Sequence, residues 1–117
     1  MHTARWAASG AAVLAMLSVA ACGGGGGTPA RHVTFNLTID GHTMRPDSPT
    51  AHQGDTVTVN INADRKEEIH LHGYDYKFEM TPGQRESRTF TADKTGSFEI
   101  EIEGTSTHLG ELDVYPR

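Results

Sequence analysis

The sequence predicts an all-β protein, a sandwich of short antiparallel strands. Three observations support this fold class. Apolar and polar residues alternate in several separate stretches, which is typical of strands with one buried face. Turn signals rich in glycine, proline and aspartate separate those stretches at regular intervals. No stretch repeats its apolar residues with the period of about 3.6 residues that marks an amphipathic helix.

The expected strands follow in chain order from their alternation and their flanking turns. They cover residues 33–39, 55–62, 67–80, 87–91, 98–103 and 109–115. The third is irregular, and the proline-containing segment 42–54 is expected to be a loop with room for one short edge strand. The alternation predicts a core that contains Phe35, Val57, Val59, Phe98, Ile100 and Val114.

The beginning of the chain predicts export. A short basic start with Arg5 precedes a small apolar run over residues 7–21, which is too short to span a bilayer. The run ends in Val-Ala-Ala-Cys at Cys22, which resembles a bacterial lipobox. We therefore expect residues 1–21 to be a lipoprotein signal peptide, and Cys22 to become the lipid-carrying N-terminus. The alternative is an ordinary signal peptide with a stray cysteine.

Residues 22–31 are expected to tether the folded part to the membrane. Five consecutive glycines at 23–27 behave as flexible coil, and ten such residues span roughly 18 Å. The domain would then face the extracellular or periplasmic side. Removal of residues 1–21 from the 117 leaves 96, with nine basic and fifteen acidic residues, a net charge of −6. That charge disfavours nucleic acid as a partner.

The chemistry of the chain centres on two histidines, His70 and His72. Apolar residues fall on odd positions before Gly73 and on even positions after it. A change of parity in a strand is a change of face, so Gly73 is expected to form a bulge or a sharp bend. His72 then lies where the chain turns over, a place suited to a functional side chain. The alternative is that both histidines are solvated on the polar face of a strand.

Three glutamates, Glu99, Glu101 and Glu103, alternate with apolar residues near the end of the chain. They would suit a cation, but a row of this kind on one strand face is usually solvated. We therefore expect these three side chains to be exposed to water without a further role.

Five segments in this order resemble the cupredoxins, the fold of plastocyanin and azurin. They are Gly-Asp-Thr-Val at 54–57, His-Gly-Tyr at 72–74, Pro-Gly at 82–83, Gly-Ser-Phe-Glu-Ile at 96–100, and the run from His108 to Val114. The resemblance implies that residues 32–117 form a Greek-key β-sandwich of about seven strands. The chain looks most like cupredoxin-like lipoproteins with a His-x-His-Gly-Tyr-Asp segment.

The resemblance does not extend to a blue copper site. That site uses two histidines, a cysteine thiolate and a weak axial methionine. The matching positions here are His72 and His108 for the histidines, but Ile102 for the cysteine and Leu112 near the methionine. Cys22 is the only cysteine of the chain. We therefore expect no blue copper electron carrier.

The remaining donors suit a different kind of metal site. Imidazole binds Cu(II) and Zn(II) well. We expect a copper ion, with zinc as the other choice, held by His72 and His108 at one end of the sandwich. His70 or a carboxylate would be the third ligand. Asp75, which would not bind the metal itself, would orient one of the histidines, and the alternative is that it simply caps the turn.

The other features of the sequence narrow the function further. Met44 and Met80 could bind Cu(I), but we expect both to pack in the core or in a loop. No nucleophile elbow or phosphate loop is present, so we expect no enzyme. The prediction is a membrane-anchored lipoprotein that handles or stores metal at the cell surface. The alternative is a metal-free scaffold that binds another protein of the cell envelope.

Overall fold

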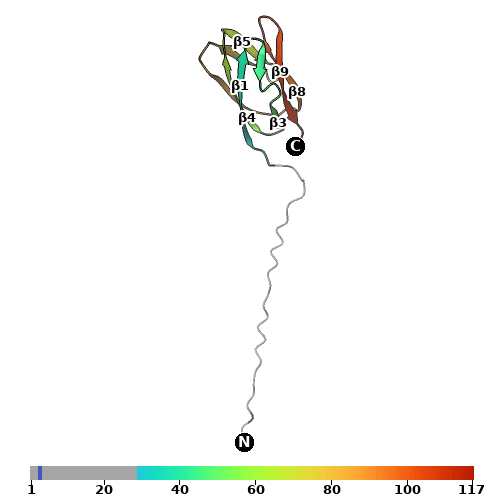
Figure 1. The fold of residues 1–117 in the computed structure, drawn as a ribbon. Coiled ribbons are helices and arrows are strands. Elements are labelled where there is room, and N and C mark those ends of the chain that lie inside the picture. Colours follow the sequence, from blue (N-terminus) through green and yellow to red (C-terminus); the bar gives the residue numbers. More distant parts are fainter. Residues whose placement is uncertain (1–2, 4–28) are drawn as a thin grey trace.

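The computed structural model describes Thr3 and residues 29–117, and the latter form a β-sandwich (Figure 1). Its strands are β1 (His32–Asp40), β2 (Thr43–Arg45), β3 (Thr50–His52), β4 (Thr56–Ala63), β5 (Glu67–Leu71), β6 (Tyr76–Met80), β7 (Glu86–Thr91), β8 (Gly96–Ile102) and β9 (Thr107–Tyr115). Apart from Thr3, the predicted signal peptide, Cys22 and the tether up to residue 28 lie outside the described residues. None of the described residues belongs to a helix that could span a membrane.

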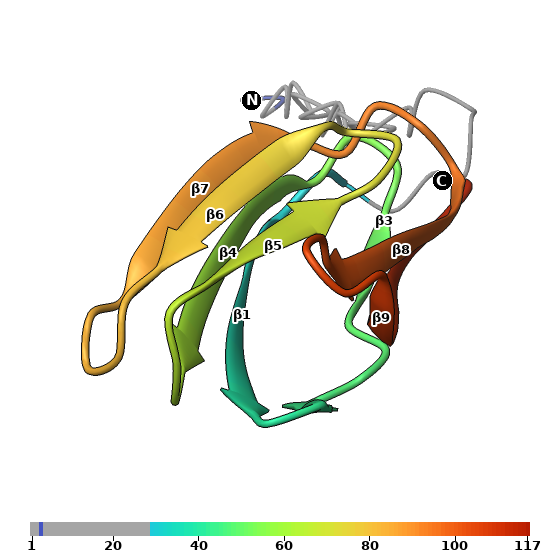
Figure 2. The same ribbon diagram turned by 90° about the horizontal axis from the view of Figure 1, so that it is seen from above.

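The strands form two sheets, which Figure 2 shows from above. The four-stranded sheet has the order β2-β1-β4-β7, and the five-stranded sheet has the order β3-β9-β8-β5-β6. β6 and β7 lie side by side where one edge of each sheet meets the other. The all-β sandwich predicted from the sequence is confirmed.

The prediction of purely antiparallel pairing is wrong for two pairs. β1 and β4 are parallel, and so are β3 and β9. After β1 and β2 the chain crosses to the other sheet for β3, and it then re-enters the first sheet so that β4 runs in the direction of β1. Alternation reports which face of a strand is buried, and it carries no information about strand direction. The segment 42–54 holds two short strands instead of one.

The expected irregular strand over residues 67–80 is a hairpin of β5 and β6, closed by a turn at 72–75. Gly73 has a φ of 83°, which favours glycine. A Cβ at this position would lie 2.3 Å from Phe98 Cδ1. The change of parity at Gly73 therefore comes from a turn that only glycine fits, as the sequence indicated.

The core lies between the two sheets. Four of the six predicted core residues are buried, while Phe35 and Phe98 are partly buried and pack against the core. Met44 and Met80 are each 2% exposed, which confirms that they pack in the core. The fully or almost fully buried apolar side chains include Leu37, Ile39, Val57, Ile61, Ile69, Leu71, Phe78 and Leu112.

One charged side chain, Asp55, is completely buried at the end of the sandwich where β4 begins. It accepts hydrogen bonds from the backbone nitrogens of Arg31 at 3.0 Å and His52 at 2.9 Å, and it pairs with the guanidinium of Arg117. Burial acts to raise the pKa of Asp55, but these hydrogen bonds and the positive charge outweigh it. The pKa therefore lies below its ordinary value of 3.8.

Arg117 connects further segments at the same end. Its Nε donates to the backbone oxygen of Gln53 at 2.7 Å, and its Nη1 donates to that of Pro29 at 2.6 Å. The segment before β1, the turn after β3 and the last residue are therefore fastened together through one side chain.

Candidate metal centre

The candidate site lies on the outer face of the five-stranded sheet, across its three neighbouring strands β5, β8 and β9. His70 pairs with Glu101 in the β5–β8 ladder, and Glu101 pairs with His108 in the β8–β9 ladder. Because residues two apart share a face, His72 and Glu99 lie in the adjoining row. The backbone nitrogen of His72 donates to the backbone oxygen of Glu99 at 2.9 Å, which fixes that second row.

A β-bulge turns His108 toward this face. Ile100 pairs with Gly110 but Glu101 pairs with His108, so Leu109 is the extra residue in β9. Leu109 and Leu112 are both buried, while the side chain of His108 is 58% exposed. Without the extra residue, the parity of Leu112 would point His108 into the core. Bulges commonly re-aim a side chain in this way.

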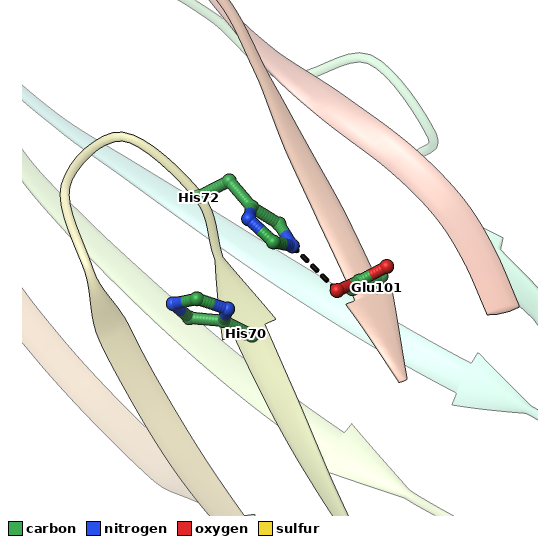
Figure 3. Close-up of side chains that lie close together, drawn as sticks. All are labelled: His70, His72 and Glu101. Carbon is green, nitrogen blue, oxygen red and sulfur yellow. Dashed lines mark hydrogen bonds and ion pairs between the residues drawn. The ribbon is translucent and has the colours of Figure 1, made fainter. Parts of the chain in front are cut away.

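Three side chains form a compact group of metal donors, His70, His72 and Glu101 (Figure 3). One ligand atom from each lies within 4.8 Å of the others. His72 Nε2 is 2.5 Å from Glu101 Oε1, and the two imidazole rings are 4.2 Å apart between centroids. The exposed side-chain fractions are 13% for His70, 16% for Glu101 and 41% for His72, so the group opens to solvent on one side.

Two polar atoms beside this group are buried without a hydrogen-bond partner among the described residues, His70 Nε2 and Glu103 Oε2. His70 Nε2 is 3.7 Å from Asp75 Oδ1, and His70 Nδ1 is 3.8 Å from Glu103 Oε2. Both separations are too long for a hydrogen bond. An unpaired buried polar atom is unfavourable, and such atoms often mark a bound ion or water. The donor set therefore fits a metal ion.

Asp75, which the sequence suggested as a residue that orients a histidine, lies close to His70. Its φ is 58°, an uncommon backbone conformation for a residue other than glycine, and its side chain is 83% exposed. The carboxylate faces His70 without reaching hydrogen-bond distance. Its role as an orienting residue stays a prediction.

His108 belongs to a neighbouring group of side chains. Its Nδ1 is 2.8 Å from Glu99 Oε2, and its Nε2 is 3.5 Å from Glu111 Oε2. The other oxygen of Glu99 is 3.8 Å from His72 Nε2. The structure thus brings His70 and His72 together and places His108 two strands away, linked to His72 through Glu99. His72 and His108 both lie on the outer face of the sheet, and a single ion shared by them stays a prediction.

The sequence did not identify Glu99 and Glu101 as functional residues. The row of glutamates was expected to be solvated, but Glu101 is largely buried against His72, and Glu99 contacts both His72 and His108. Alternation did place these glutamates on the outer face. The missing information was the pairing of β8 with β5 and β9, which local sequence does not encode.

The described domain offers no thiolate to a metal. Ile102, which occupies the position expected for the blue-copper cysteine, is 4% exposed and packs in the core. Leu112, near the position of the axial methionine, is 1% exposed. The chain has one cysteine, Cys22, which lies outside the described residues.

Solved structures of copper proteins resemble this sandwich. A copper-binding protein in the apo form matches with a TM-score of 0.60 at 12% identity, over 75% of this chain and 92% of that one. The metal-binding domain of a Cu(I)-exporting P-type ATPase of Streptococcus pneumoniae, with Cu(I), gives 0.62 at 10% identity, over 73% and 93%. A multicopper oxidase gives 0.56 at 17% identity, over 75% of this chain and 40% of its own.

Sequence comparison adds no closer relative, since no family model and no curated protein matches the chain. At these identities the structural likeness establishes the fold alone. The two sheets, the parallel β1–β4 pair and these neighbours together show that residues 29–117 have a cupredoxin-like fold.

Proposed function

We propose that this protein handles copper, and that it binds Cu(II) at a non-blue site formed by His70, His72 and Glu101. One observation carries the proposal: the three donor atoms already lie within 4.8 Å of one another. A small rearrangement brings them to coordination distance, since metal–nitrogen and metal–oxygen bonds of about 2 Å place two ligands on one ion up to about 4 Å apart.

The donor atoms determine the class of ion. Two imidazoles and a carboxylate suit Cu(II) and Zn(II), whereas Cu(I) prefers the thiolate or thioether that this site lacks. Between the two divalent ions, Cu(II) generally binds the same donors more tightly. Two of the structural neighbours, a copper-binding protein and a metal-binding domain with Cu(I), support the choice of copper over zinc.

The proposed location is the outer side of a cell membrane. The Val-Ala-Ala-Cys sequence at Cys22 and the glycine run that follows it support a lipid anchor and a flexible tether. In this position the domain stores or passes on copper at the cell surface, with the metal ion as its main ligand. The proposal is a binding function and not catalysis, because the sequence carries no motif of an enzyme.

Metal titration of the mature protein in mild detergent, purified without an affinity tag, tests this function. We expect Cu(II) to bind, and His70→Ala and His72→Ala each to weaken binding by a hundredfold or more. The matched controls His42→Ala and His52→Ala should bind as the wild type does. A protein that retains no Cu(II) or Zn(II), or variants of His70 and His72 that bind normally, would refute the proposal. The metal-free interaction module would then be the better interpretation.

A further inference from the structure

We infer that the same face binds a second divalent ion, at His108, Glu99 and Glu111, beside the first. This inference rests on the proposed function. It also gives His108 a different role from the one that the sequence suggested, because His108 would bind the second ion instead of sharing the first ion with His72.

The charges around His108 favour a cation. Glu99 and Glu111 lie directly opposite each other on β8 and β9, and like charges in that arrangement repel. Both carboxylates turn toward His108, one to each ring nitrogen, at 2.8 Å and 3.5 Å. One imidazole between two carboxylates is a donor set that Cu(II) and Zn(II) both accept.

These three donors are more exposed than the first group. The exposed side-chain fractions are 58% for His108, 43% for Glu99 and 35% for Glu111. The two ring nitrogens of His108 face different carboxylates. To bind one ion, the side chains would have to rotate until a single nitrogen of His108 and both carboxylates surround it. Exposed side chains rotate readily. The greater exposure of these side chains and their need to rotate each predict that the second ion binds more weakly than the first.

Glu99 connects the two positions. One of its oxygens is 3.8 Å from His72 Nε2, and the other is 2.8 Å from His108 Nδ1. β8 supplies glutamates to both groups, β5 supplies histidines on one side, and β9 supplies His108 on the other. Adjacent strands are about 4.8 Å apart, so the two ions would lie roughly one strand spacing from each other. Carboxylates also connect the ions of paired metal sites, although those ions are usually closer together, about 3.5–4 Å apart.

Titration of the mature protein with Cu(II) tests the inference by stoichiometry. We expect two ions per chain in the wild type, one in His108→Ala, and a second ion that binds at least about tenfold more weakly in Glu111→Gln. The control His32→Ala removes an exposed histidine from the outer face of the other sheet and should leave two ions. Circular dichroism checks that each variant is folded.

Electron paramagnetic resonance provides an independent readout. Two Cu(II) ions at this separation interact magnetically, so the signal at two equivalents should integrate to fewer than two isolated spins. At one equivalent, or in His108→Ala, it should be that of an isolated ion.

The outcomes separate this inference from the proposed function. One ion in the wild type, unaffected by His108→Ala, overturns the second position and leaves the first intact. One ion that His108→Ala abolishes overturns it in favour of a single site shared by His72 and His108. No bound ion at all overturns both proposals.

Discussion

Replacement of Gly73 by alanine should destabilise the domain far more than the same replacement at Gly83. Both glycines have positive φ, 83° and 77°, so alanine brings backbone strain of about 1–2 kcal/mol at each. The space around them differs. A Cβ at Gly73 would lie 2.3 Å from Phe98 Cδ1 and 2.8 Å from its Cε1, whereas a Cβ at Gly83 would meet nothing within 4 Å.

The overlap sets the size of the difference. The Phe98 ring is held edge-on against Tyr74 at 4.7 Å between centroids, so it must move and lose that contact. Overpacking of this kind costs about 1–3 kcal/mol. The total for Gly73→Ala is about 2–5 kcal/mol, against about 1–2 kcal/mol for Gly83→Ala.

Denaturant unfolding followed by fluorescence measures both variants, and thermal unfolding should show a melting temperature lower by roughly 4–8 °C per kcal/mol. Because Gly73 follows His72 directly, Gly73→Ala should also weaken Cu(II) binding, while Gly83→Ala should not. Equal losses of stability for the two variants would refute the close approach of Phe98 to this turn.

Four further predictions test the fold, the buried charge, the anchor and the absence of a blue site. Ile100→Ala should cost roughly 2–5 kcal/mol in the free energy of unfolding, whereas the exposed Glu79→Ala should cost well under about 1 kcal/mol, and equal losses would mean that the strand faces are assigned wrongly. Folding lowers the pKa of Asp55, so its contribution to the free energy of unfolding should be complete above its ordinary pKa of 3.8 and should be lost as pH falls from there through the lower pKa of the folded state. In Asp55→Asn the free energy of unfolding should therefore depend less on pH in this acidic range. Cys22→Ala should stay uncleaved or leave the membrane fraction, and membrane binding with processing unchanged contradicts the anchor. Since Ile102 replaces the thiolate, the copper-loaded protein should show no intense band near about 600 nm, and a blue colour would overturn the ligand alignment.

Local sequence predicted much of the fold because burial leaves a period-two signal. Val57, Val59, Ile100 and Val114 are buried as their alternation indicated. The glycine at position 73 marked the change of face because its conformation and its space exclude other residues. The alternation and the positive φ of Gly73 are local properties of the chain, which is why the sequence alone reveals them, whereas the approach of Phe98 to Gly73 is not visible in the sequence.

The candidate site depends on neighbours in space, and the sequence revealed only part of it. The pair His70 and His72 was visible as a spacing. The partner Glu101 is distant in sequence and becomes a neighbour through the β5–β8 ladder. The bulge at Leu109 reverses the parity of β9, so alternation back from Leu112 would place His108 in the core. Strand direction and register are set by the whole sandwich, and no single segment encodes them.

The fastening of Arg117 has a mechanical consequence. Its guanidinium bonds the carbonyl of Pro29, just before β1, so the two ends of the domain are joined directly. A pulling force between the segment before β1 and Arg117 would first load this contact and the bonds of Arg117 to Gln53 and Asp55. β5, which carries His70 and leads into His72, lies two strands away from β9, the strand that ends just before Arg117. If residues 22–31 tether the domain as proposed, tension would therefore load the Arg117 contacts before it reached the strand that carries His70.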